Sequence, residues 1–357
     1  SEMCIRDSLN AGLKMRYFNK LFFVTLLLFI LPYQSFASEV NVYTSRHYDS
    51  DEVIYEDFTN LTGIKVNIIS GKGKALMERL RLEGKNSPAD LFITSDAGNL
   101  WKIQKDGMFR EILSEKIVKT VPDSARGPNN EWVGITKRSR VIFYNPEKVK
   151  DIEIMNITYE DLADPKWKGR LVVRSSGNIY NQSLVASLIS RIGIQRTEKW
   201  AKGIVKNFAR KPQGNDRSQI LAVANGEADI AIANTYYIGL MLSGEKGIDQ
   251  KKAAEKVSMI LPGQADGGTH INISGVGILK NAPNPSNAEK LIEYLLTDKV
   301  QKYIVDNTYE YPIKSNIMPS KIIAKFGTNF KTDETYASDF GKYNSEAVRL
   351  MDRAGWR

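Results

Sequence analysis

The chain has 357 residues, 42% of them hydrophobic and 25% charged, which is enough for about two globular domains. With only one cysteine, Cys4, and two histidines, it has little material for disulfides, cysteine nucleophiles or zinc sites. The formal net charge is +9, but the lysines are scattered and form no basic tract interleaved with aromatic residues. Nucleic acid is therefore a poor candidate partner. Because the sequence also lacks a Gly-x-Ser-x-Gly elbow and phosphate-loop spacing, we expect no enzyme.

Residues 1–37 have the pattern of an upstream extension followed by a secretory signal peptide. Met15 precedes two basic residues and the apolar run 21–30, and a small-x-small cleavage pattern ends at Ala37. An uncleaved membrane anchor is the alternative, but the apolar run is short for a bilayer span. We expect cleavage near Ala37-Ser38, export to the periplasm and a mature chain that has no cysteine and stays mildly basic.

Strands and helices alternate after residue 38, with no internal repeat. Apolar spacing and glycine stops predict strands over 40–44, 64–69 and 89–94, helices over 51–62 and 75–82, and a third helix through Trp101 that stops at Gly107. This β-α-β-α-β order predicts a parallel sheet with right-handed crossovers.

Two long extended segments follow, over 132–145 and 270–279. Between them the pattern predicts strands over 169–173 and 228–237, and helices over 182–192, 196–207 and 218–225. We therefore expect an α/β protein with two lobes joined by two crossing hinge strands, an arrangement suited to closure around a ligand. The first lobe would comprise 38–136 and 272–312, and the second 137–271 and 313–357.

The predicted strand from Ala228 ends in two adjacent tyrosines, Tyr236 and Tyr237. Ligands in open α/β sheets bind just outside the carboxyl ends of strands, so this pair is a candidate site. Two phenols side by side could hold a hard, highly charged cation. The alternative is that both rings only pack at the end of the strand, since aromatic side chains often serve as buried area.

Five segments share a family pattern, namely 42–48 (Val-Tyr-Thr-Ser-Arg-His-Tyr), 88–92 (Pro-Ala-Asp-Leu-Phe), 175–183, 234–237 and 270–275. Together they resemble the bacterial periplasmic ferric-iron-binding proteins, which are the substrate-binding components of iron(III) ABC transporters. The resemblance covers nearly all of residues 39–320. It implies the two-lobed class II periplasmic binding protein fold, Fe(III) as the transported ligand, an inner-membrane permease as partner and a monomeric protein.

The tyrosine-rich subgroup of this family implies four iron ligands, Tyr48, Tyr180, Tyr236 and Tyr237. His47 lies where some family members have a histidine ligand, so it is a further candidate, either as a ligand or as a neighbour of the ligands. Arg138 could offset excess phenolate charge without binding the metal. Other members use a carboxylate and a bound anion. No equivalent carboxylate can be identified in this sequence, which favours four phenolates.

The chemistry of the residues agrees with that implication. Iron(III) is small and triply charged and prefers anionic oxygen, and a bound metal ion stabilises the deprotonated phenol. The alternative is a protein of the same fold for thiamine, a polyamine or a phosphonate. An organic cation would require a carboxylate-lined aromatic box, and an anion would require arginines and helix N-termini. The tyrosine cluster favours neither, and we expect a structural role for His270.

Overall fold

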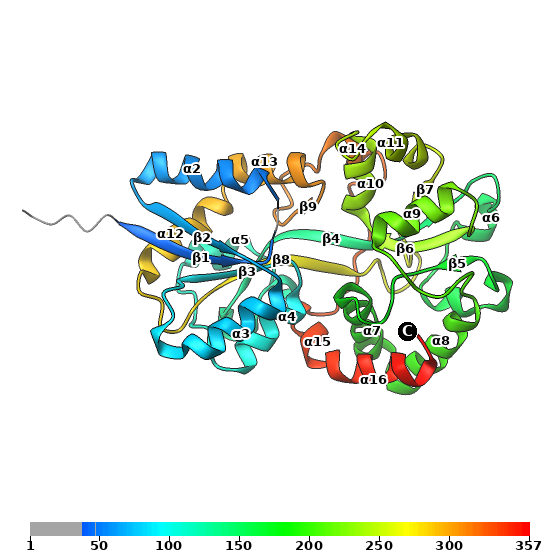
Figure 1. Ribbon diagram of the computed structural model, residues 1–357, viewed down its shortest axis with the longest axis horizontal. Helices are drawn as coiled ribbons and strands as arrows, with labels where there is room; N and C mark the ends of the chain where they lie inside the picture. Colours follow the sequence, from blue (N-terminus) through cyan, green and yellow to red (C-terminus); the bar gives the residue numbers. More distant parts are fainter. Residues whose placement is uncertain (1–37, 47) are drawn as a thin grey trace, which may run out of the picture. The chain divides into compact units, whose positions relative to one another are not determined.

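A nine-stranded mixed sheet runs through the body formed by Glu39–Arg357 in this computed structural model, which describes residues 38–46 and 48–357 (Figure 1). The strand order is β2-β1-β3-β8-β4-β6-β5, and β7 and β9 also pair with β4. The strands are β1 (Glu39–Thr44), β2 (Lys65–Ser70), β3 (Leu91–Thr94), β4 (Val133–Tyr144), β5 (Leu171–Val172), β6 (Ile230–Asn234), β7 (Ser258–Ile260), β8 (Ile271–Ile278) and β9 (Tyr311–Pro312).

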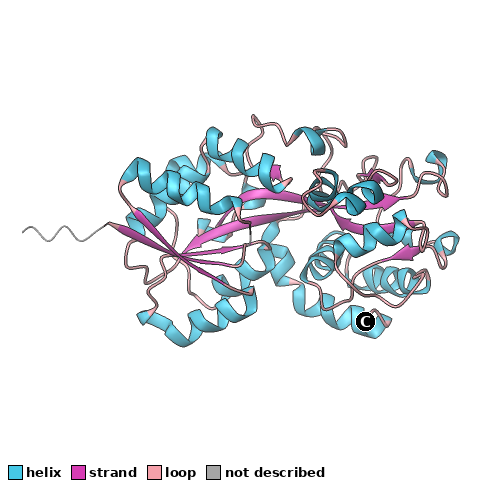
Figure 2. Ribbon diagram, turned by 45° about the horizontal axis from the view of Figure 1, so that its top comes forward, coloured by secondary structure: helices cyan, strands magenta, loops and turns pink. Residues whose placement is uncertain are grey.

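Helices flank this sheet, and short 3-10 turns link several of them (Figure 2). The α-helices are α2 (Ser50–Thr62), α3 (Gly73–Glu83), α4 (Ala97–Lys105), α5 (Glu115–Thr120), α6 (Asp151–Ile154), α7 (Ile179–Ile192), α8 (Ile194–Lys206), α9 (Asp216–Ala224), α10 (Thr235–Leu242), α11 (Ile248–Ala254), α12 (Pro285–Leu295), α13 (Asp298–Thr308), α14 (Lys321–Ala324), α15 (Ala337–Lys342) and α16 (Asn344–Ala354). The 3-10 helices are η1 (Gly84–Asn86), η2 (Asp123–Ala125), η3 (Pro128–Asn130), η4 (Glu160–Ala163) and η5 (Pro165–Trp167).

The predicted parallel start of the sheet is confirmed. Strand β1 pairs in parallel with β2 on one side and with β3 on the other. Helix α2 ends at Gly63, which adopts the left-handed conformation that a glycine stop allows. In Figure 1, α2 and α13 lie on one side of these strands, and α3 and α4 lie on the other.

Strands β4 and β8 are the two crossing strands that the sequence predicts. They pair antiparallel from Val133 opposite Val276 to Ser139 opposite Ile271. Beyond that point β4 leaves β8 and continues into the second lobe, where it pairs with β6 from Arg140 onward. A single strand therefore carries residues of both lobes, and its middle lies at the junction between them.

The apolar interior is divided between the two lobes. Residues of β1, β3, α2 and α12 build the core of the first lobe, and residues of α7, α8, α9 and β6 build two adjoining clusters in the second. The C-terminal segment contributes to both lobes, because Phe340 packs in the first core whereas Leu350 packs in the second. Helix α15 thus lies close to both halves of the protein, touching α4 and α7.

Within residues 38–46 and 48–357, no helix is both long enough and apolar enough to cross a bilayer. The predicted leader 1–37 and the candidate ligand His47 lie outside the described residues.

Candidate metal centre

All four predicted tyrosines line one cavity of about 420 Å³, together with groups from both lobes. Tyr48 comes from the first lobe, and the other three come from helices of the second. The cavity is also lined by Arg46, Arg138, Leu240, Glu245, Lys246 and Tyr309. A concave site with convergent polar groups at a lobe junction is the usual form of a ligand site.

Tyr48 lies in the short connection between β1 and α2. Arg46 fixes this connection, because its backbone N–H donates to Thr44 Oγ1 at 3.0 Å and its guanidinium donates to Asp51, near the start of α2, at 2.9 Å. The Arg46 guanidinium also lies 4.6 Å from the centre of the Tyr48 ring. The loop is thus tied at both ends, which holds the Tyr48 phenol at the cavity.

Tyr180 lies in the first turn of α7, which begins before the predicted helix start at 182. The next residue, Asn181, is buried and donates to the carbonyl oxygens of Arg174 and Ser175 at 2.8 and 3.2 Å. It also accepts a hydrogen bond from Arg140 at 2.6 Å. These contacts fix the Ser-Ser-Gly-Asn loop, so the phenol of Tyr180 is presented by a rigid helix start.

Tyr236 and Tyr237 lie in the first turn of α10, so the prediction of a strand as far as 237 is wrong at its end. Strand β6 stops at Asn234, where the Asn-Thr turn signal stands, and the helix begins at Thr235. On a strand, neighbouring side chains would point to opposite faces. The helical turn instead places the two rings together, with centroids 4.1 Å apart and planes at 31°.

Two of the phenol oxygens are already close together. The hydroxyls of Tyr236 and Tyr180 lie 3.5 Å apart, which joins the starts of α7 and α10. The guanidinium of Arg138 lies 5.4 Å from the ring of Tyr236 and 5.8 Å from that of Tyr180.

Three of the phenols, Tyr48, Tyr236 and Tyr237, are held in the neutral form by their surroundings. Burial raises the pKa of Tyr48 well above its ordinary value, with a further rise from Glu310 that Arg138 partly offsets. Burial also raises the pKa of Tyr236 and Tyr237, and the neighbouring phenols raise it further because like charges would be brought together. A cation that binds here must therefore displace protons.

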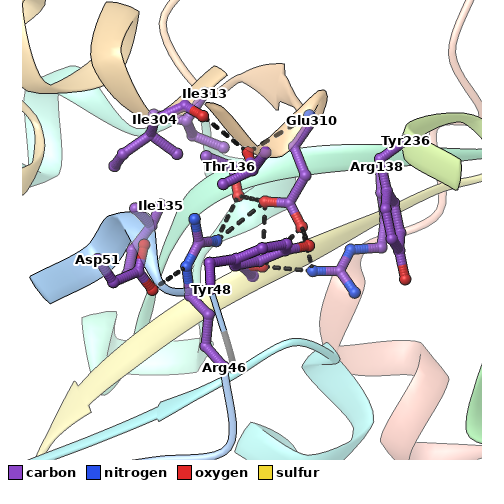
Figure 3. A network of polar contacts seen from close by, with 12 residues as sticks. Arg46, Tyr48, Asp51, Ile135, Thr136, Arg138, Tyr236, Ile304, Glu310 and Ile313 are labelled. Carbon is purple, nitrogen blue, oxygen red and sulfur yellow. Dashed lines mark hydrogen bonds and ion pairs between the residues drawn. The ribbon is translucent and has the colours of Figure 1, made fainter. Parts of the chain in front are cut away.

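A buried carboxylate that the sequence analysis did not single out, Glu310, links the two cavity arginines to Tyr48 (Figure 3). It accepts hydrogen bonds from Arg138 at 2.7 Å, from Arg46 at 2.9 Å and from the Tyr48 hydroxyl at 2.9 Å. Thr136 also donates to it. Burial alone would raise the pKa of Glu310, but the two arginines outweigh that effect and hold it at about 2.

A second buried ion pair lies behind the second-lobe tyrosines. Arg140 donates to Asp216 at 3.0 Å, and Asp216 accepts the backbone N–H of Asn234 at 3.1 Å. Thr136, Arg138 and Arg140 alternate along β4 and so share one face. Two arginines at alternate positions of a predicted crossing strand are a signal that could have predicted buried acidic partners, although not which residues they are.

Of the two histidines, only His270 belongs to the described part of the chain. His47 is outside the described residues, so its predicted role is untested. His270 is buried just before β8 and packs edge-on against Phe340, with ring centroids 4.8 Å apart. Burial lowers the pKa of His270 to about 4, so it is neutral at physiological pH. His270 is not among the residues that line the cavity.

Comparisons with known proteins agree with the fold and with the residue pattern. Residues 45–302 match the family model of bacterial extracellular solute-binding proteins. Iron uptake protein A1 of Synechocystis is 50% identical over 319 residues, covering 89% of this chain and 88% of that protein. The Trichodesmium protein FutA, solved with iron and citrate ligands, superposes with a TM-score of 0.86 at 48% identity, covering 90% of this chain and 100% of that one.

A ferric binding protein from Campylobacter jejuni superposes with a TM-score of 0.83 at 40% identity, covering 89% of this chain and 100% of that one. These likenesses confirm the family and the two-lobed fold that the sequence motifs imply. The chain belongs to the bacterial extracellular solute-binding protein family, and its relatives within that family include proteins named for iron uptake and ferric-iron binding.

Proposed function

We propose that this protein binds ferric iron in the cavity between its lobes and delivers it to an inner-membrane ABC permease. The observation that carries the proposal is the convergence of four phenols on one cavity, with two of their oxygens 3.5 Å apart. The proposed ligands are Tyr48, Tyr180, Tyr236 and Tyr237. The iron is the transported cargo of the protein and takes no part in a reaction.

The charges of the surroundings suit a trivalent cation. Four phenolates would place four negative charges against three positive charges on the metal. Arg138 is buried between Glu310 and the rings of Tyr180 and Tyr236, so it can offset the remaining negative charge without touching the iron. A divalent metal with the same ligands would leave a larger uncompensated charge in a poorly hydrated site, which is costly.

Export and lobe movement complete the proposal. Residues 1–37 would be removed near Ala37-Ser38, and the mature protein would act as a monomer in the periplasm. The first lobe would span 38–136 and 272–312, and the second 137–271 and 313–357, with the crossing strands β4 and β8 as hinge. His47, adjacent to Tyr48, is a candidate for a remaining coordination position.

Proton release measures phenolate coordination in solution. The pKa values of Tyr48, Tyr236 and Tyr237 are raised, so these groups are protonated at neutral pH and must lose their protons to bind iron. We expect more than about two protons released per Fe(III) in weak buffer, and an affinity that falls as the pH falls. Iron binding with proton release near zero would show that the tyrosines are not the ligands. If iron does not bind, thiamine, a polyamine and a phosphonate are the next ligands to test.

A further inference from the structure

Several hydrogen-bond donors surround the carboxylate of Glu310, and the Tyr48 hydroxyl is one of them. Its side chain is completely buried and is surrounded by Arg46, Thr136, Arg138 and Ser274 in addition to the Tyr48 phenol (Figure 3). We propose that Glu310 is a positioning residue that restrains Tyr48 through the hydrogen bond from its hydroxyl. Iron must break this Tyr48–Glu310 hydrogen bond before the phenol can bind the metal. This inference rests on the proposed ferric-iron function.

The backbone around Glu310 fixes its position. Helix α13 ends at Thr308 and is capped by Tyr309, which adopts a left-handed conformation with φ of 60° and turns the chain back toward β4. The following residues, Tyr311 and Pro312, form β9 and pair with Lys137 and Thr136 of β4. Glu310 thus lies between a helix end and a paired strand, and it cannot follow Tyr48 if the phenol moves.

The turn at Tyr309 is itself held in place by the second lobe. The Tyr309 ring packs so closely against Gly239 of α10 that a Cβ atom at that glycine would collide with it. The Tyr309 hydroxyl donates to Glu245 at 2.6 Å. Helix α10 also carries Tyr236, so Glu310 is anchored to the element that presents the second-lobe ligands.

The phenol of Tyr48 cannot serve Glu310 and a metal ion at once. It donates its proton to the carboxylate at 2.9 Å, whereas a metal ligand must offer the deprotonated oxygen. A phenolate left in the same place would face a carboxylate at hydrogen-bond distance, and two such anions repel. Ligation by Tyr48 therefore requires that its oxygen turn away from Glu310 toward the cavity.

Hydrogen-bond donors are available both for the displaced Tyr48 phenolate and for the Glu310 carboxylate that it leaves. Arg138 Nε and Nη1 are buried and have no hydrogen-bond partner among the described residues. Arg138 lies between Glu310 and Tyr236, so its unpaired donors lie beside the space between Tyr48 and the second-lobe tyrosines (Figure 3). Ser274 already lies 3.3 Å from both oxygens of Glu310 and can strengthen its hydrogen bond when Tyr48 leaves.

A double-mutant cycle tests the role of Glu310. Glu310→Gln keeps the size of the side chain but replaces a charge-assisted acceptor with a weaker neutral one. We expect Glu310→Gln to raise the Fe(III) affinity, measured against a competing chelator, by about fivefold. In the Tyr48→Phe background the same substitution should change the affinity by less than about twofold, since the hydrogen bond is already absent.

Asp51→Asn is the matched control. It removes one carboxylate charge from Arg46, as Glu310→Gln does, but the Asp51 carboxylate has no hydrogen bond to the Tyr48 hydroxyl among the described contacts. Only the backbone N–H of Asp51, which the substitution keeps, donates to the Tyr48 carbonyl oxygen, at 2.9 Å. We expect the Fe(III) affinity of Asp51→Asn to change by less than about twofold. Equal gains from Glu310→Gln in the parent and in Tyr48→Phe, or an equal gain from Asp51→Asn, would overturn the inference, because general electrostatics would then account for the effect.

A loss of affinity in Glu310→Gln would also overturn the inference, since Glu310 would then assist Tyr48 instead of restraining it. If Glu310→Gln does not fold, Glu310→Asp carries the test, because it keeps the charge beside both arginines and draws the carboxylate back from Tyr48. It should raise the affinity in the parent and not in Tyr48→Phe, and the opposite result contradicts the inference. A parent protein that binds no Fe(III) would refute the proposed function itself.

Discussion

Tyr236→Phe is expected to weaken Fe(III) binding by more than about 100-fold, since even partners outside the ligand set commonly contribute 10- to 100-fold in metal affinity. The substitution removes only the hydroxyl and leaves the ring stacked on Tyr237 with centroids 4.1 Å apart. The lost oxygen is the one that lies 3.5 Å from the Tyr180 hydroxyl, and it is one of the proposed second-lobe ligands that iron would meet first.

Competition with a chelator of known strength would measure this loss, with Tyr311→Phe as control. Tyr311 is a buried tyrosine of β9 whose hydroxyl donates to the carbonyl oxygen of Gly327 and which does not line the cavity. We expect the control to keep the affinity of the parent protein. Parent-like binding by Tyr236→Phe would exclude Tyr236 as a ligand.

Tyr48→Phe is expected to keep Fe(III) binding, in weakened form, but to lose most of the closure of the two lobes. In the proposed mechanism, iron first occupies the three second-lobe phenolates, and closure would then bring Tyr48 across the cavity from the first lobe. A ligand shifts a conformational equilibrium only by its difference in affinity for the two states, and that difference here is chiefly the bond to Tyr48. Tyr48→Phe should therefore bind Fe(III) roughly tenfold more weakly and lose most of the iron-driven compaction.

Small-angle scattering of the iron-free and iron-loaded forms would record the compaction. Tyr294→Phe is a suitable control, because Tyr294 is a first-lobe tyrosine whose hydroxyl donates to Asp57 and it does not line the cavity. If Tyr48→Phe compacts on iron addition as fully as the parent does, another first-lobe group closes the site. His47, its neighbour in the sequence, would then be the first candidate.

Much of the scaffold follows from local patterns in the sequence. Apolar runs predict β1 and β3, apolar spacing with a glycine stop predicts α2, and the two long extended segments predict β4 and β8, because strand and helix periods are local properties. The end of β6 was predicted less well. Tyr236 and Tyr237 have good strand propensity, but Asn234 and Thr235 stop the strand and begin a helix, so the two rings share one side.

The polar surroundings of the tyrosines could not be predicted in the same way. Glu310 lies 262 residues from Tyr48 and 172 from Arg138 in the sequence, and nothing in its Thr-Tyr-Glu-Tyr-Pro neighbourhood distinguishes it from a surface glutamate. The contact of Glu310 with Arg46 forms only when β9 pairs with β4 in the folded protein. The arginines of β4 could have indicated that an acidic partner exists, since buried charges require partners, but they do not identify that partner.

The visible absorption spectrum of the mature protein titrated with Fe(III) at neutral pH is the most direct test of tyrosinate coordination. Phenolate bound to iron(III) undergoes ligand-to-metal charge transfer, so the complex should be coloured and its absorption should rise until each chain holds one iron. Tyr236→Phe should reduce the absorption per bound iron. A colourless Fe(III) complex of the parent protein would contradict ligation by Tyr48, Tyr180, Tyr236 and Tyr237.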